Sequence, residues 1–261
     1  MLWLLRYPAW YINFSIPIWD KFSGSKYSHF FSNAYQNLEL PEYMIEISII
    51  ERVRMNKKII SIQDTNRKEH FLYFKNIGYP YVGLTVNLDI THFLQNLKAT
   101  GNPFYLSFLY RVVNAANAIP EFRRRIENDG IVEYDYCKAS NVILKNDNSF
   151  AYCTLDCSKP FSVFLTEGRE SIERAKDKGN IQENDDVESL FFISCIPWVS
   201  YTSITQAVPF PPDSNPRFTW GKYMQQNNQT LIPVSVLAHH ALIDGFHISQ
   251  FFIKLESLLA A

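Results

Sequence analysis

Three of the six histidines, His239, His240 and His247, lie within nine residues near the C-terminus, and Asp244 lies between them. An imidazole with a pKa near neutrality is suited to remove a proton from a hydroxyl group as a general base. Histidine and aspartate are also metal ligands, so the same group is compatible with a metal site. Neighbouring histidines on an extended strand point to opposite sides, which disfavours one shared metal. A third interpretation is that these are ordinary polar residues at the end of a strand.

The elements around these histidines would position them. The run LIPVSVLA, residues 231–238, predicts a buried strand because it is continuously apolar. The run HISQFFIKLESLLAA, residues 247–261, has an apolar stripe at helical spacing and predicts an amphipathic helix. Asp244 is a candidate N-cap for that helix. A rigid strand end followed by an open turn is a frequent place for active-site groups.

In the rest of the chain, segments with the apolar period of a strand alternate with segments that have the period of a helix. We expect a mixed β-sheet covered by helices, an α/β (α+β) fold in two layers. Two hairpins are predicted at 123–135 and 140–156, because each has a turn rich in Asn, Asp or Gly. The predicted strands are 57–63, 82–90, 190–196 and 198–207, and the predicted helices are 64–76, 91–97, 104–119 and 162–179.

Composition excludes several classes of protein. The 261 residues are 47% hydrophobic and 20% charged, so the chain is not disordered and buries one substantial core. A net charge of −1 gives no general attraction to nucleic acid or to an anionic membrane. The four cysteines include no CxxC pair, which favours reduced thiols in a cytoplasmic protein. Arg6, Pro8 and Pro17 interrupt the apolar beginning, so a spanning helix is not expected, and weak membrane association is the minor alternative.

Four segments together resemble one family. The run HHALIDGFH, residues 239–247, resembles the HHxxxDG signature of CoA-dependent acyltransferases, and its last two residues make it similar to the chloramphenicol acetyltransferase family. Three further segments resemble that family in the same order: NRKEHFLYF at 66–74, FFISCIPWVSYTS at 191–203 and TWGKY at 219–223. The resemblance covers the chain from about Met55 to the end, and four segments in order are specific where HHxxxDG alone is not.

The resemblance implies a mechanism and an assembly. His240 matches the catalytic base, and Ser194 matches the serine that donates a hydrogen bond to the tetrahedral oxyanion. Asp244 matches a structural aspartate that positions the loop through an ion pair with the arginine matched by Arg67. Acetyl-CoA is implied as co-substrate, with no permanently bound cofactor and no metal. The family is a homotrimer whose active site lies between subunits, so we expect His240 to face Phe74 and Phe150 of a neighbour.

The resemblance also assigns binding residues. Thr219 matches a threonine that anchors a water near the intermediate, and Trp198 lies in the acetyl-CoA-binding region. Tyr73, Phe74 and Phe150 match the walls of the acceptor pocket. The chain departs from the family at Ile204 and Gln206, where an aromatic residue and a leucine are usual; a change of this kind redirects acceptor affinity by roughly 1–3 kcal/mol.

The expected acceptor is chloramphenicol, which would make the enzyme a cause of antibiotic resistance. Two alternatives within the family are an enzyme for a different hydroxylated small molecule and a catalytically inactive relative. Taken singly, Ser194 is an ordinary strand residue, Arg67 a solvated charge, and Trp198 and Phe150 core residues.

Two other acyltransferases carry the same signature. A dihydrolipoyl transacylase core would need lipoyl and linker modules, and a peptide-synthetase condensation domain would need a second domain of similar size, so neither is favoured. The domain prediction is a family domain over residues 55–261. Residues 1–54 are expected to be a poorly ordered extension or not to belong to the native product.

Overall fold

The computed structural model describes residues 57–183 and 186–261. The predictions for residues 1–54 lie outside the described residues. No helix in the described ranges is both long enough and apolar enough to cross a membrane.

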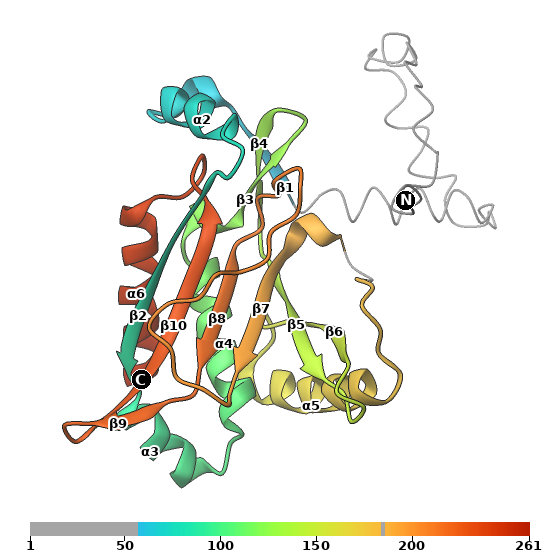
Figure 1. The fold of residues 1–261 in the computed structure, drawn as a ribbon, viewed down its shortest axis with the longest axis vertical. Coiled ribbons are helices and arrows are strands. Elements are labelled where there is room, and N and C mark those ends of the chain that lie inside the picture. Colours follow the sequence, from blue (N-terminus) through green and yellow to red (C-terminus); the bar gives the residue numbers. More distant parts are fainter. Residues whose placement is uncertain (1–56, 184–185) are drawn as a thin grey trace, which may run out of the picture. The chain divides into compact units, whose positions relative to one another are not determined.

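The main element is a mixed seven-stranded sheet with the order β2-β10-β8-β7-β5-β6, and β9 pairs with β10 (Figure 1). β10 lies antiparallel to β2 on one side and to β8 on the other. β7 lies parallel to both β8 and β5, and β5 forms an antiparallel hairpin with β6. The strands are β2 (Tyr81–Asp89), β5 (Lys138–Leu144), β6 (Phe150–Leu155), β7 (Leu190–Ile196), β8 (Arg217–Gly221), β9 (Met224–Gln226) and β10 (Gln229–His239).

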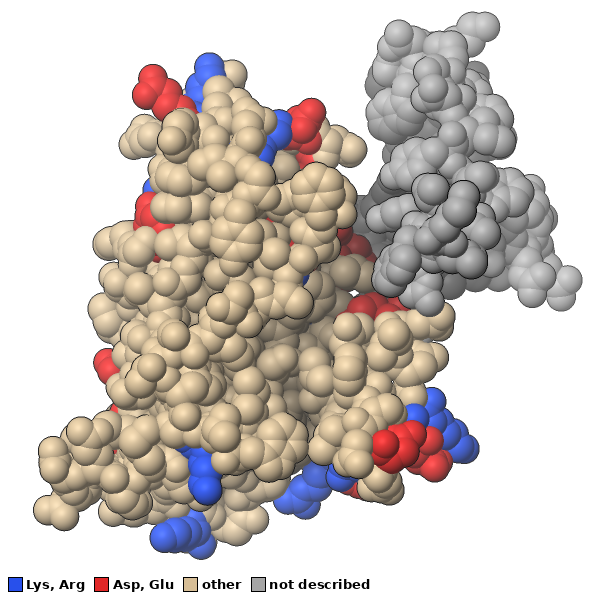
Figure 2. Space-filling model, in the orientation of Figure 1, with Lys and Arg blue, Asp and Glu red and all other residues tan. Residues whose placement is uncertain are grey.

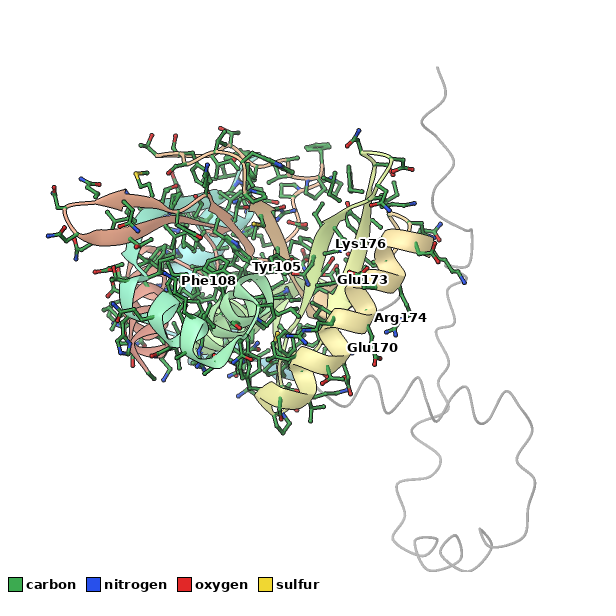
Figure 3. The ribbon with its side chains drawn as sticks, turned by 90° about the horizontal axis from the view of Figure 1, so that it is seen from below. Tyr105, Phe108, Glu170, Glu173, Arg174 and Lys176 are labelled. Carbon is green, nitrogen blue, oxygen red and sulfur yellow. The ribbon has the colours of Figure 1, made fainter. Side chains whose placement is uncertain are left out.

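Helices pack on one face of this sheet and bury the core. Side chains from α4 and α6 pack against those of β8 and β10. For example, the ring centroids of Phe251 on α6 and Phe218 on β8 are 5.0 Å apart. Glu170, Glu173, Arg174 and Lys176 lie on α5 and are exposed or half-buried (Figure 3). The helices are α3 (Thr91–Thr100), α4 (Phe104–Asn117), α5 (Phe161–Lys178) and α6 (Gly245–Ala260).

A second sheet has the order β1-β4-β3. Its strands are β1 (Lys57–Ile60), β3 (Arg124–Glu127) and β4 (Gly130–Tyr134), and α2 (Lys68–Lys75) follows β1 after a 3₁₀ turn at Ile62–Asp64. Asn128 and Asp129 form the β3–β4 turn with positive φ, which these two residue types tolerate better than others. Short 3₁₀ turns also lie at Pro120–Arg123 and Val187–Ser189.

The predicted mixed α/β fold is confirmed, and both predicted hairpins form. The strand predicted at 198–207 is wrong, because this segment has no regular structure. Both neighbouring positions of β7 are already occupied by β5 and β8, so the segment after β7 has no free edge there to pair with. The helix predicted at 64–76 begins later, at Lys68.

No helix of the described residues, 57–183 and 186–261, packs on the second face of the seven-stranded sheet (Figure 1). Side chains of β7 point alternately to the two faces: Phe191 and Ile193 are buried on the helix side, while Phe192 and Ser194 on the other side remain partly accessible. Figure 2, in the orientation of Figure 1, shows charged side chains at the margins of the surface and a broad uncharged area between them. We call the side without helices the open face.

Candidate active site

β10 ends at His239, and the turn that follows leads into α6. Asp244 caps the helix: its Oδ1 accepts hydrogen bonds from the backbone N–H groups of Phe246, at 2.9 Å, and His247, at 3.4 Å. In return, Nδ1 of His247 accepts from the backbone N–H of Asp244 at 3.2 Å. The predicted N-cap is confirmed, and the reciprocal capping fixes the turn that carries His240.

Arg67, at the start of α2, holds the same aspartate from the other side. Its Nη1 donates to Oδ2 of Asp244 at 2.6 Å. Burial alone would raise the pKa of Asp244, but the hydrogen bond from Arg67 and the charges of His247 and Arg67 outweigh it and lower the pKa to about 2. Arg67 is therefore not a free solvated charge, and the predicted ion pair is present.

His240 is oriented by backbone groups. Its backbone N–H donates to the carbonyl of Pro80 at 2.7 Å, and its own carbonyl accepts a hydrogen bond from Nε2 of His70 at 2.7 Å. Nδ1 of His240 lies 3.0 Å from the carbonyl oxygen of Ile243. A carbonyl only accepts, so in the neutral imidazole Nδ1 carries the proton and Nε2 has the lone pair. The imidazole is half-buried and has the tautomer that a base at Nε2 requires.

Phe74 contacts His240 within one chain. The two rings stack at 3.9 Å between centroids with an interplanar angle of 27°. Tyr73, next to it on α2, is 68% exposed. The expectation that His240 faces Phe74 of a neighbour is therefore wrong: α2 folds over the turn after β10 because Arg67 and His70 both bond to it.

His239 has a different environment from His240. It is buried, its Nδ1 accepts from the backbone N–H of Ala241 at 3.2 Å, and its ring lies edge-on to Tyr81. Burial lowers the pKa of His239 to about 4, although the charge of Asp213 acts in the opposite direction. In the part of the chain that the structure describes, no three His, Cys, Asp or Glu side chains come together as metal ligands.

Ser194 lies on the open face of β7 and lines a cavity of about 600 Å³. Its strand neighbour Thr219 lines the same cavity, and the carbonyl of Thr219 accepts from the Tyr201 hydroxyl at 2.9 Å. Burial raises the pKa of the adjacent Cys195 thiol to about 11, so that thiol is protonated at neutral pH and is a poor nucleophile. The cavity thus offers hydroxyl groups rather than a thiolate.

The structure does not bring Ser194 and His240 together within one chain. Ser194 on β7 is paired in register with Thr219 on β8, and Thr219 is paired in register with Ser235 on β10. His240 follows Ser235 by five residues, so it lies about 16 Å further along the sheet and about 10 Å across it. Neither His240 nor Asp244 lines the cavity.

The other expected binding residues occupy three places. Ile204 lines the cavity with Ser194, as does Gln206. Trp198 is 64% exposed on the turn after β7, and Phe150 is 48% exposed at the start of β6. Neither aromatic residue belongs to the core, so the interpretation of Trp198 and Phe150 as ordinary core residues is wrong.

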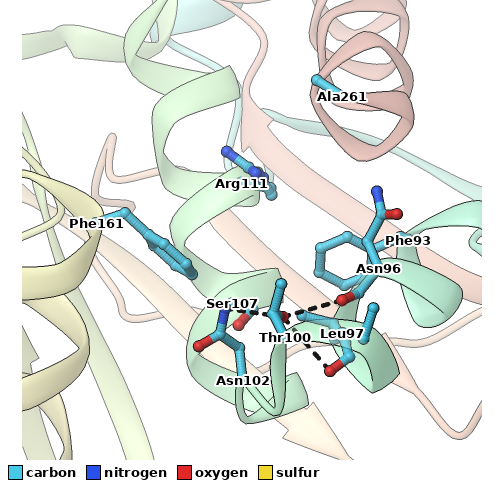
Figure 4. Close-up of a pocket in the computed structure, with 10 residues that line it drawn as sticks. Phe93, Asn96, Leu97, Thr100, Asn102, Ser107, Arg111, Phe161 and Ala261 are labelled. Carbon is cyan, nitrogen blue, oxygen red and sulfur yellow. Dashed lines mark hydrogen bonds between the residues drawn. The ribbon is translucent and has the colours of Figure 1, made fainter.

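Sequence reasoning missed two charged residues of the described cavity lining, Arg217 and Glu183. Glu183 lies in the loop between α5 and β7, in the stretch GNIQEN, which has no periodicity or motif that would single it out. A second cavity, of about 470 Å³, lies between helices and contains none of the expected site residues (Figure 4). It is lined mainly by α3 and α4, including Phe93, Ser107 and Arg111.

Comparison with known proteins agrees with the four segments. The family model of chloramphenicol acetyltransferase matches residues 55–256. A chloramphenicol acetyltransferase of Clostridium perfringens is 31% identical over 210 residues, which cover 78% of this chain and 95% of that protein. One from Escherichia coli is 30% identical over 209 residues, covering 77% of this chain and 95% of that protein.

Solved structures give the same result. A chloramphenicol acetyltransferase structure is similar with a TM-score of 0.67 and 31% identity, covering 78% of this chain and 99% of that one. A probable dihydrolipoamide acetyltransferase of Listeria monocytogenes is similar with a TM-score of 0.57 at 14% identity, covering 87% of this chain and 95% of that one. At that identity the second likeness concerns the fold alone.

Proposed function

Because the chain belongs to the chloramphenicol acetyltransferase family, we propose that it transfers the acetyl group of acetyl-CoA to a hydroxyl group of chloramphenicol. Acetyl-CoA acts as co-substrate, and the reaction requires no permanently bound cofactor. Acetylation of the antibiotic would make the enzyme a cause of chloramphenicol resistance. We place the enzyme in the cytoplasm, where acetyl-CoA is available.

In the proposed reaction His240 is the general base. Its Nε2 takes the proton of the acceptor hydroxyl, and the oxygen attacks the thioester carbonyl carbon directly, without an acyl-enzyme. The observation that carries this role is the hydrogen bond from Nδ1 to the carbonyl of Ile243 at 3.0 Å, which selects the neutral tautomer with its lone pair at Nε2. When the tetrahedral intermediate collapses, the carbon–sulfur bond breaks and the proton passes from His240 to the CoA sulfur.

Ser194 stabilises the negative charge that develops on the thioester oxygen. Its hydroxyl is held on a strand rather than on a mobile loop, so the donor is in place before the reaction. One such donor contributes about 3 kcal/mol to transition-state stabilisation. Thr219, beside it on β8, anchors a water near the intermediate, and Trp198 contacts acetyl-CoA.

The active site is formed between copies of the chain in a homotrimer. The separation of His240 from Ser194 supports this arrangement, because the base and the oxyanion donor must meet at one acetyl group. Exposed apolar side chains support it too, since an enzyme of this size rarely leaves many of them uncovered. They lie on β5 and β6 and on the loop after β7: Val142, Leu144, Phe150, Trp198, Val199 and Phe210.

The acceptor lies between the open face and the neighbouring turn. Tyr73 and Phe74 accompany His240 into the site, while Phe150 and Ile204 belong to the subunit that supplies Ser194. A different hydroxylated acceptor is the second candidate, because Ile204 and Gln206 line the cavity where the family has an aromatic residue and a leucine.

A thiol-release assay tests the proposed reaction. The enzyme is incubated with acetyl-CoA and chloramphenicol, and in parallel with other hydroxylated aromatic acceptors. We expect release of CoA that depends on the acceptor and is lost in His240→Ala. CoA release that persists in His240→Ala would contradict the role of His240, and its absence with every acceptor would contradict the acetyltransferase itself.

A further inference from the structure

The described lining of the cavity at Ser194 includes one carboxylate, that of Glu183. Glu183 is half-buried there, and its two carboxylate oxygens accept hydrogen bonds from the hydroxyls of Ser140 and Thr154. Both donors are neutral. Ser140 lies on β5 and Thr154 lies opposite it on β6. Within residues 57–183 and 186–261, no lysine or arginine forms an ion pair with Glu183. The described hydrogen-bond donors to this carboxylate are therefore neutral hydroxyls and not a cation.

The other charged group of the cavity is already neutralised. Arg217 is buried and donates from Nη1 and Nη2 to the two carboxylate oxygens of Asp213 at 2.8 and 2.7 Å. Lys138 lies two residues before Ser140 on the same face of β5 but does not line the cavity. Of the two charged side chains that the described residues contribute to its lining, Glu183 is the one without a charged partner among those residues.

The remaining described walls of the cavity are largely apolar, with Val142, Phe192 and Ile204 among them. An ionised group among apolar walls has lost part of its hydration and interacts strongly with a charge of opposite sign. A ligand ammonium group would provide that charge in the pocket that holds Ser194. Gln206 also lines this cavity, and its amide oxygen can accept a hydrogen bond from such an ammonium group.

We propose that Glu183 selects acceptors that carry a positively charged amine beside the hydroxyl group that is acetylated. This inference rests on the proposed function and names the class of acceptor for the same site. Glu183 acts as a specificity-determining residue: it contacts the acceptor and leaves the reacting hydroxyl to His240. A neutral acceptor such as chloramphenicol would be turned over without that contact.

Two matched probes test the charge. Both keep the nitrophenyl propanediol of chloramphenicol; one has a dimethylammonium group in place of the dichloroacetamide, and the other an isopropyl group of the same shape. The tertiary amine forms no stable amide, so CoA release reports only O-acetylation. Dissociation constants are measured by calorimetry at neutral pH for the wild type, Glu183→Gln and the control Glu173→Gln, whose side chain is exposed on α5.

We expect the wild type and Glu173→Gln to bind the ammonium probe about 10-fold more tightly than the isopropyl probe, and Glu183→Gln to lose this preference. Glutamine still bonds to the two hydroxyls, and an unchanged melting temperature confirms that the variant is folded. Equal binding of both probes by the wild type would overturn the proposal, as would a preference that survives in Glu183→Gln. Absence of acetyl transfer with the preference intact would overturn the proposed reaction alone.

Discussion

Arg67 and Asp244 are 177 residues apart in the sequence and are joined by a hydrogen bond of 2.6 Å between Nη1 and Oδ2. The bond ties the N-cap residue of α2 to the N-cap residue of α6. Because the turn that carries His240 lies directly before Asp244, the ion pair fixes both the turn and the start of the helix that follows it. The position of the imidazole thus depends on contacts made from both ends of the domain.

Replacement of Asp244 by asparagine should destabilise the protein and lower its activity. The native pKa of about 2 lies below the ordinary value of 3.8, so ionised Asp244 stabilises the fold above pH 3.8, and this contribution is lost as the pH falls toward 2. We expect a loss of about 2 kcal/mol at neutral pH. Denaturant unfolding of both proteins from neutral pH down to pH 2 measures it. A constant difference across that range, or an unchanged melting temperature with full activity, would contradict the role of this ion pair.

His239 should make stability depend on pH in a higher range. Its folded pKa is about 4 and its ordinary value is 6.5, so the unfolded chain binds the proton first as the pH falls, and stability decreases from pH 6.5 to pH 4. We expect His239→Gln to remove up to about 3 kcal/mol of this decrease. Unfolding at several pH values and one protein concentration measures the slope. The control His92→Gln, at an exposed position of α3, should keep the wild-type slope. Equal slopes in all three proteins would contradict the prediction.

Replacement of Ser194 by alanine should affect the chemical step. Loss of one oxyanion donor lowers kcat by about 10²-fold, whereas the KM for either substrate should change little because the ground state does not need the hydroxyl. Steady-state kinetics with acetyl-CoA and chloramphenicol separate the two parameters. Ser158→Ala, at an exposed turn, serves as the control. A change confined to KM would show that Ser194 binds substrate and does not stabilise the transition state.

Much of the fold could be predicted from the sequence, because periodicity is a local property. The apolar run of β10, the stripe of α6 and the two hairpin turns each carry their signal within a dozen residues. The segment 198–207 was the exception. Its alternation is typical of a strand, but pairing needs a free strand edge, and only the assembled sheet reveals that β7 has none.

The candidate site was predictable where it is encoded in motifs. His240, Ser194, Asp244 and Arg67 all lie in segments that resemble the family, and the capping by Asp244 follows from its place before the helix. The stacking of Phe74 on His240 of its own chain depends on how α2 folds back, which no local pattern reports. Glu183 lacks any sequence signal, because its place in the cavity comes from hydrogen bonds to residues on two distant strands.

The central claim is that His240 of one copy acts with Ser194 of another, and subunit mixing tests it most directly. His240→Ala and Ser194→Ala are each expected to be nearly inactive alone. After the two variants are unfolded together in equal amounts and refolded, about a quarter of the sites should combine an intact His240 with an intact Ser194 and regain activity. Activity in the mixture that does not exceed the mean of the two separate variants would contradict the shared site.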